Sequence, residues 1–265
     1  MGTPRRTIKT RDTKWAKELA TYVATKTDIT PNDISLYSVY CGLVAFIAYI
    51  GYVCPQIPEQ FYPLLAIIAV IGIQLRLLCN LIDGMVAVEG GKKSVVGDIY
   101  NEFPDRLSDT FILIGAGIAG SSWISVSLGI MAALFAMFTA YTRVLAGAVG
   151  ATQKFLGPMA KQHRMALLTV ATLICVAEPF CHNLHRVVYP TVLIIMIIGT
   201  VITVWNRINE ATNELTEKGR EPEQNSEQEN GQISEQNSEQ ETEQKTEHNE
   251  EREQDNENDN DNGQN

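Results

Sequence analysis

The sequence lacks the features that define several common classes of protein. Its five cysteines are odd in number, and their spacings match no zinc, haem or thioredoxin motif. Most of them lie in apolar stretches, where a thiol packs as a small hydrophobic group. A secreted domain held together by disulfides is therefore excluded.

The charge is distributed so unevenly that averages describe neither part of the chain. Residues 217–265 hold 17 of the 31 acidic groups and four of the 21 basic ones, a net charge of −13. The remaining 216 residues are strongly apolar and have a net charge of +3. This body is too apolar for a soluble enzyme. It is also too weakly basic for a nucleic-acid-binding domain, so no nucleic-acid partner is expected.

The C-terminal tail almost entirely lacks apolar residues. From Glu217 onward it contains one aliphatic residue, Ile233, and no aromatic residue. Such a segment cannot bury enough apolar surface to offset its ordering entropy. We therefore predict that residues 208–265 form a disordered Glu/Gln/Asn-rich tail. The tail either serves only for solubility or binds a basic partner.

Six apolar segments of the body each have nearly the length of about 20 residues that crosses a bilayer as a helix. We predict membrane-spanning helices at about 34–53, 61–83, 103–121, 124–147, 165–180 and 187–206. Lysine and arginine concentrate in the N-terminal segment and in the loops after the second and fourth helices. The positive-inside rule places these loops and both termini in the cytoplasm. The predicted fold is an all-α, multi-pass membrane protein with a six-helix domain over residues 34–207.

A polar and basic segment, residues 1–33, precedes the six-helix domain. An apolar stripe on a helix that begins near Asp12 is formed by Trp15, Leu19, Tyr22 and Val23. The stripe predicts an amphipathic helix that lies either in the membrane interface or against another part of the protein. The segment ends in Thr30-Pro31-Asn32-Asp33, which is typical of a capped helix start.

Polar residues in the apolar domain gather at the facing ends of the second and third predicted helices. Arg76, Asn80 and Asp83 share one helix face. The third helix begins with a second polar face, formed by Asp98, Asn101, Glu102, Asp105 and Asp109. Ionisable groups at this depth are costly and indicate a functional site. Carboxylate and amide oxygens suit a hard cation such as Mg²⁺, which binds few protein ligands together with substrate phosphate oxygens.

The polar residues form a long motif, Asn80-x2-Asp83-Gly84-x2-Ala87-x9-Gly97-x3-Asn101-x3-Asp105. This motif resembles the signature of the CDP-alcohol phosphatidyltransferases, D-x2-D-G-x2-A-R-x8-G-x3-D-x3-D, and aligns with it without a gap. Segments similar to other parts of the family are Thr30–Ser35, Tyr141–Arg143 and Gly157–Met165. The resemblance covers about residues 28–207.

Three positions depart from the family signature. Asn80 and Asn101 replace aspartates, and Val88 replaces an arginine. The site therefore loses two negative charges, which weakens the binding of divalent cations. Glu102 and Asp109 share the polar face of the third helix, so they are candidates for auxiliary carboxylates.

The resemblance implies transfer of a phosphatidyl or phospho-alcohol group from a CDP-linked donor to an alcohol, with release of CMP. The implied ligands of Mg²⁺ or Mn²⁺ are Asn80, Asp83, Asn101 and Asp105. Asp105 is in addition the implied general base. The residues implied to contact the nucleotide are Gly84, Ala87 and Gly97. The implied acceptor-binding residues are Arg143, Lys161 and Arg164.

The implied partners are a CDP-linked lipid donor, a small alcohol or sugar-phosphate acceptor, membrane lipids and a second copy of the chain in a homodimer. The active site is expected on the cytoplasmic side. The departures from the signature motivate an alternative, a noncatalytic family member that binds nucleotide, lipid or a protein partner. Retention of Asp83 and Asp105 favours catalysis. The sequence leaves open the acceptor and whether the donor is CDP-diacylglycerol or a CDP-alcohol.

Overall fold

A computed structural model describes residues 13–89 and 96–219 of the chain. Within these ranges the regular structure is entirely helical, so the predicted all-α class is confirmed. The α-helices are α1 (Lys14–Lys26), α2 (Pro31–Ile50), α3 (Tyr62–Glu89), α4 (Gly97–Ala119), α5 (Trp123–Ala148), α6 (Lys161–Ile174) and a C-terminal helix (Leu184–Gly219). Short 3₁₀ turns lie at Gly51–Val53, Glu59–Phe61 and Cys175–Ala177.

The chain divides into two units, Met1–Ala211 and Thr212–Asn265, and all tertiary contacts described below lie within the first. The C-terminal helix continues to Gly219, so residues 208–219 are helical, although the predicted disordered tail includes them. The rest of the predicted tail, the basic residues before Thr13 and the loop at 90–95 lie outside the described residues.

Four helical stretches in the described residues are long and apolar enough to cross a membrane: Pro31–Val53, Glu59–Val88, Trp123–Ala148 and Leu184–Gly219. The protein is therefore an integral, multi-pass membrane protein. The other two predicted spans correspond to α4 and α6, which do not meet this description. The first half of α4 is rich in charged residues. Helix α6 has 14 residues and reaches only roughly 21 Å, less than the thickness of a bilayer core of about 30 Å.

The helix start predicted at Thr30 is confirmed. The Thr30 hydroxyl accepts a hydrogen bond from the Asp33 backbone N–H at 3.2 Å. In return, the Asp33 carboxylate accepts from the Thr30 backbone N–H at 2.9 Å. Pro31 occupies the first turn of α2, where a missing N–H costs nothing. This capping box fixes the point at which the chain enters the helical bundle.

The second and third predicted helices extend beyond their predicted bounds. Helix α3 continues six residues past the predicted end at residue 83, to Glu89. Helix α4 begins at Gly97 rather than near residue 103. The predicted bounds mark the membrane spans, and both helices continue past them. The added residues 84–89 of α3 are mostly apolar, and the added residues of α4 include Glu102, which pairs with Arg143 of α5. Neither added segment contains a proline that would end the helix.

Helix α1 packs against α3 through small residues. Ala16 and Ala20 are fully buried in a cluster that includes Ile82 and Val86 of α3. Trp15 and Tyr22 of the predicted stripe remain 49% and 60% exposed. Leu19 and Val23 of the same stripe pack against this cluster. The alternative that the stripe packs on another part of the protein therefore holds for these two residues, and contact of Trp15 and Tyr22 with the membrane interface stays a prediction.

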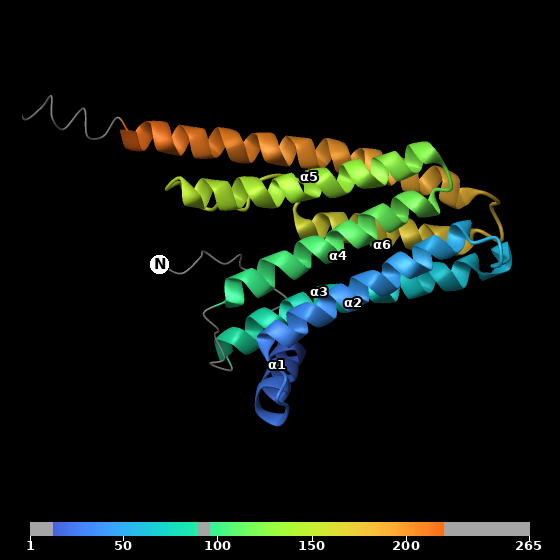
Figure 1. Ribbon diagram of the computed structural model, residues 1–265, viewed down its shortest axis with the longest axis horizontal. Coiled ribbons are helices and arrows are strands. Elements are labelled where there is room, and N and C mark those ends of the chain that lie inside the picture. Colours follow the sequence, from blue (N-terminus) through green and yellow to red (C-terminus); the bar gives the residue numbers. More distant parts are fainter. Residues whose placement is uncertain (1–12, 90–95, 220–265) are drawn as a thin grey trace, which may run out of the picture. The chain divides into compact units, whose positions relative to one another are not determined.

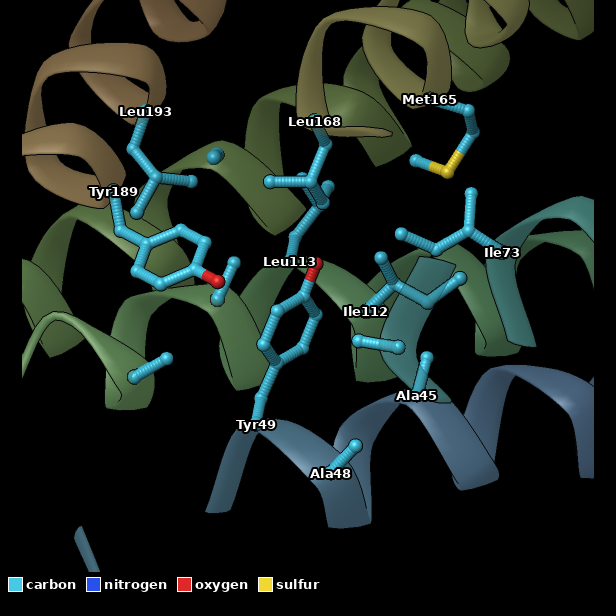
Figure 2. Packing of buried hydrophobic residues seen from close by; sticks show 14 of the residues in the cluster. Ala45, Ala48, Tyr49, Ile73, Ile112, Leu113, Met165, Leu168, Tyr189 and Leu193 are labelled. Atoms are coloured by element: carbon cyan, nitrogen blue, oxygen red, sulfur yellow. The ribbon is translucent and has the colours of Figure 1, made fainter. Parts of the chain in front are cut away.

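The bundle core is formed jointly by α2, α3, α4, α5, α6 and the C-terminal helix. Figure 1 shows α2, α3, α4 and α5 as long helices that run along one another. Figure 2 shows Tyr49 of α2 directed toward Leu113 of α4, with Leu168 of α6 and Leu193 of the C-terminal helix around it. The Tyr49 hydroxyl lies 2.7 Å from the Thr172 hydroxyl of α6. A buried hydroxyl in an apolar core is thereby satisfied.

Close contact between helices depends on glycine. Because lipid tails are as apolar as leucine, burial alone drives helix association weakly in a membrane, and tight packing at small residues becomes important. Gly117 of α4 and Gly129 of α5 lie against each other. A Cβ atom at Gly129 would lie 2.8 Å from the Leu113 carbonyl oxygen and 2.9 Å from the Gly117 Cα. Both neighbours are backbone atoms, so only movement of a helix could make room.

We predict that Gly129→Ala lowers the melting temperature of the purified protein in detergent. Glycine to alanine in a helix normally stabilises it by up to about 1 kcal/mol, but here overpacking costs about 1–3 kcal/mol. The matched control is Gly219→Ala, which places its methyl group in open space within the described residues. An unchanged or raised melting temperature for Gly129→Ala would show that α4 and α5 do not approach as closely as the structure indicates.

Candidate active site at the ends of α3, α4 and α6

The predicted polar faces of α3 and α4 do lie together. The two helices follow each other in the chain, and side chains of α3 bond directly to carboxylates of α4. The beginning of α6 and the end of α5 contribute further cations to the same region. The result is a cluster of ion pairs around α4, which we call the α4 charge cluster. It consists of Glu102, Asp105 and Asp109 together with Arg76, Arg106, Arg143, Lys161 and Arg164.

Arg76 is the buried centre of the α4 charge cluster. Its side chain is 0% exposed. Its Nη2 atom lies 2.5 Å from Asp109 Oδ1 and 3.2 Å from Asp105 Oδ1. The same atom donates to the Asp105 backbone carbonyl at 3.2 Å. One guanidinium therefore holds two carboxylates a helical turn apart and fixes the rotation of α4 against α3.

Asp105 receives hydrogen bonds on both carboxylate oxygens. The Asn80 amide group donates to Oδ1 at 2.9 Å and to Oδ2 at 3.0 Å. Lys161 forms an ion pair with Oδ2, and Arg76 contacts Oδ1. The residue is 5% exposed. Asp105, the predicted general base, thus lies where side chains from α3 and α6 meet, and its charge is compensated from two sides.

Lys161 joins two of the predicted metal ligands. Its ammonium group donates to Asn80 Oδ1 at 2.6 Å and also bonds to Asp105 Oδ2. The two oxygens come from different helices and converge on one positively charged group. Lys161 is the first residue of α6, and its side chain remains 21% exposed.

Asp83 lies on α3 about one turn from Asn80 and is held by a residue of α2. The Ser35 hydroxyl donates to Asp83 Oδ2 at 2.6 Å, and the Gly84 backbone N–H donates to Oδ1 at 2.5 Å. Asp83 is 4% exposed. The sequence interpretation gave Ser35 no role at the site. Two features of the sequence could have pointed to Ser35. It is a polar residue one turn inside α2, and it lies in the segment Thr30–Ser35 that resembles the family.

The other predicted site residues have different surroundings. Asn101 lies on the exposed surface of α4, one turn before Asp105. The residues predicted to contact the nucleotide are all half-buried: Gly84, Ala87 and Gly97. Val88, which replaces the arginine of the family signature, is 53% exposed.

Arg164 is a buried structural residue and does not present a free charge to an acceptor. It is 1% exposed and contacts Asp109 Oδ2 at 3.2 Å. It also donates to the Thr139 hydroxyl at 3.2 Å and to the Met159 carbonyl at 3.0 Å. Asp109 therefore lies between Arg76 and Arg164, and both of its oxygens face arginine. This arrangement leaves it poorly placed to be an auxiliary metal ligand.

Glu102, the second auxiliary carboxylate, is bound by two arginines. It forms ion pairs with Arg106, one turn along α4, and with Arg143 of α5. The Arg143 guanidinium also stacks over the Phe155 ring at 5.1 Å. The predicted cationic patch is thus divided, because each of its three members pairs with a different carboxylate of α4.

A pocket opens beside Arg143, at the end of α5. Its lining residues are Thr142, Arg143, Ala146, Thr152, Lys154, Leu156, Arg207, Glu210 and Ala211. Arg207, which the sequence interpretation missed, donates from Nε to the Leu156 carbonyl at 3.0 Å and from Nη1 to the Thr139 carbonyl. No sequence motif marked it, since it directly follows the predicted span 187–206 and resembles a residue that reaches toward lipid headgroups.

The oxygen atoms of the site are chemically suited to a divalent cation, although its carboxylates are few. The described residues contain no group of three or more His, Cys, Asp or Glu side chains arranged to hold a metal ion. The oxygens of Asn80 and Asp105 nevertheless converge on one cation, the Lys161 ammonium, in place of a metal ion. Hard oxygen donors of this kind suit Mg²⁺ or Mn²⁺ when substrate phosphates complete the shell.

Comparison of the fold with solved structures gives a clear relationship. No protein-family model and no curated protein sequence matches the chain. The crystal structure of Mycobacterium tuberculosis phosphatidylinositol phosphate synthase with CDP-DAG bound is similar with a TM-score of 0.58 and 14% identity, covering 75% of this chain and 94% of that chain. Its complex with manganese and citrate is similar with a TM-score of 0.57 and 14% identity, covering 74% and 88%.

The chain is thus an all-α membrane protein whose fold is similar to that of this phosphatidylinositol phosphate synthase. That synthase is a CDP-alcohol phosphatidyltransferase, so the resemblance inferred from the motif is confirmed at the level of the fold.

We predict that Arg76→Met strongly destabilises the protein, because it leaves Asp105 and Asp109 buried without their shared cation. Breaking a buried ion pair in this way costs about 3–5 kcal/mol. The comparison variant is Lys154→Met, which breaks a pair with Glu210 whose side chains are 41% and 42% exposed. That change should cost at most about 1 kcal/mol. Thermal unfolding in detergent measures both, and equal melting temperatures would contradict the central position of Arg76.

Proposed function

We propose that the protein transfers a phosphatidyl group from a CDP-linked donor, CDP-diacylglycerol in the first instance, to an alcohol and releases CMP. The observation that carries this proposal is the contact between Asn80 and Asp105 at adjoining ends of α3 and α4, with Asp83 on the same face of α3 as Asn80. These residues belong to the motif that resembles the family signature. The fold match to a synthase with CDP-DAG bound supports the same class of donor.

The proposed membrane arrangement has six spans, with α4 and α6 added to the four long apolar helices. The charged first half of α4 lies in the membrane in this arrangement. Its carboxylates are paired with cations from α3, α5 and α6. This arrangement places both termini and the site in the cytoplasm, in agreement with the positive-inside bias. The proposal also includes a homodimer and a division of the chain into residues 1–33, 34–207 and 208–265. Residues 208–219 of the last segment are helical.

The metal-binding residues in this proposal are Asn80, Asp83, Asn101 and Asp105, with Mg²⁺ or Mn²⁺ as the cation. A divalent cation bound to a diphosphate offsets the charge that develops on the leaving CMP. Asp105 accepts the proton of the acceptor hydroxyl. The hydroxyl oxygen then forms a bond to the phosphorus of the phosphatidyl group, and the bond between this phosphorus and the bridging oxygen of CMP breaks.

The remaining residues position the reactants. Gly84, Ala87 and Gly97 offer small side chains where the nucleotide must approach the helices closely. Arg143 and Lys161 are partly exposed cations beside the site, which suits an acceptor with a phosphate or carboxylate group. Arg164 acts in this scheme through Asp109, as a positioning residue. Glycerol 3-phosphate and inositol phosphate are the preferred acceptors to test, followed by serine and amino alcohols.

One observation favours the alternative, a noncatalytic protein that binds nucleotide or lipid. Both oxygens of Asp105 are engaged by Arg76, Asn80 and Lys161, as expected for a carboxylate with a structural role. The activity assay separates the two possibilities, since only a catalyst releases CMP.

The assay measures CMP released from CDP-diacylglycerol by the purified protein in mixed micelles, with a panel of acceptors and with or without Mg²⁺ or Mn²⁺. We expect release that requires the metal and one class of acceptor. Asp105→Asn should reduce the rate by about 100-fold or more, because a positioned general base contributes roughly 10²–10⁴-fold. The matched control is Asp28→Asn, which removes an exposed carboxylate between α1 and α2.

Loss of activity in both aspartate variants would indicate unfolding rather than loss of the base. Absence of CMP from the wild-type protein, also with CDP-choline or CDP-ethanolamine and diacylglycerol, would contradict the proposed transferase and favour the noncatalytic alternative.

A further inference from the structure

The Lys161 ammonium occupies the point at which oxygens of two proposed metal ligands converge. It bonds to Asn80 Oδ1 at 2.6 Å and to Asp105 Oδ2. A divalent cation held by Asn80 and Asp105 would draw on the same side-chain oxygens. The ammonium and the metal ion would therefore compete for them.

The charge of the site makes this competition severe. Together with Asp83, the α4 charge cluster contains four carboxylates against five cations among the described side chains. Asn80 and Asn101 stand where the family signature has aspartates, and two aspartates would have reversed the balance. A region with net positive charge disfavours a divalent cation until a cation leaves or an anion arrives.

Of the two cations paired with Asp105, Lys161 is the one that can leave. Arg76 is 0% exposed and is fixed by packing. Arg106 and Arg143 are partly exposed but pair with Glu102. The Lys161 side chain is 21% exposed and has a flexible four-carbon stem. Its place in the first turn of α6 puts a positive charge at the positive end of the helix dipole, which is unfavourable without a partner such as Asp105.

We propose that Lys161 is an internal counter-cation that exchanges with the divalent metal ion. This inference rests on the proposed function, because it deepens the account of the metal site. Without donor, Lys161 neutralises Asp105 and keeps metal affinity low. The diphosphate of the donor supplies the negative charge that lets the metal ion take the oxygens of Asn80 and Asp105. The displaced ammonium then contacts a phosphate group of the donor or acceptor.

Two consequences follow from this exchange. The metal ion and the nucleotide bind cooperatively, since each raises the affinity for the other by the same factor. Removal of the ammonium raises the affinity for the metal ion alone, because the competitor is gone. A lysine that only bound the acceptor would leave the affinity for the metal ion unchanged.

The first test measures binding of Mn²⁺ to the full-length protein in micelles by electron paramagnetic resonance of free Mn²⁺, with and without CDP. Lys161→Met should bind Mn²⁺ about tenfold more tightly than wild type in the absence of CDP, as removal of a nearby like charge predicts. Lys161→Arg keeps the charge and should bind as weakly as wild type. Lys17→Met removes an exposed charge on α1 and is the matched control.

A second test needs no variant and remains decisive if Lys161→Met does not fold. Lysine acylation of the wild-type protein is followed by peptide mass spectrometry with and without saturating Mn²⁺. Release from Asp105 should increase modification of Lys161 several-fold, while modification of Lys17 stays constant. Equal modification of Lys161 in both conditions would overturn the exchange.

Unchanged or weaker Mn²⁺ binding by Lys161→Met would also overturn it. These outcomes are distinguishable from failure of the proposed function. CMP release without exchange would mean that Lys161 serves the acceptor alone. Exchange without CMP release would mean that the site binds metal and nucleotide but does not react.

Discussion

The contact of Arg76 with Asp105 and Asp109 is the interaction on which the arrangement of the site depends. A guanidinium with no exposed surface is stable inside the bundle only when carboxylates compensate its charge, and two of them lie on adjacent turns of α4. This requirement sets the rotation of α4 and directs its acidic face toward α3. The remaining cations then join from α5 and α6, and α4 can carry charges into a helical bundle that would otherwise be apolar. Replacement of Arg76 and Asp109 by apolar residues could give an equally stable bundle. It would also remove the guanidinium that holds Asp105 beside Asn80.

The same ion pairs set the chemistry of the site. In the family signature the site is rich in carboxylates, whereas here two of the signature positions are amides, Asn80 and Asn101. The cluster that results has more cations than carboxylates among the described side chains. In the exchange that we propose, metal binding in such a site would depend on anionic substrate, and Lys161 would be the group through which that dependence acts. The departures from the signature are therefore consistent with a site that is loaded jointly by metal and donor.

Much of the fold could be predicted from the sequence, because its determinants are local. Apolar segments of membrane length predict helices, and the Thr30 to Asp33 pattern predicts the start of α2 with its capping box. The facing polar ends of α3 and α4 follow from helical periodicity and the antiparallel connection. What failed was the placement of helix ends at the limits of the predicted spans, since α3 has 28 residues, more than the about 20 that a span requires, and α4 already begins at Gly97. Packing of α1 on the protein was one of two predicted alternatives, and Leu19 and Val23 of its stripe do pack there. The part played by Ala16 and Ala20 escaped prediction, because small residues give no strong hydrophobic signal.

Most members of the candidate site were predictable, but Ser35, Arg207 and the pairing of the charges were not. Spacing predicts that Arg76, Asn80 and Asp83 share a face, but it does not reveal which carboxylate each cation will choose. That choice depends on contacts between helices distant in sequence, as for Lys161 with Asp105.

The most direct test of the account is an experimental structure of the protein with CDP-diacylglycerol and Mn²⁺. The account predicts the nucleotide between α3 and α4, Mn²⁺ at Asp83 and Asp105, and Lys161 separated from Asp105. A donor bound elsewhere, or Lys161 still paired with Asp105 in that complex, would contradict it.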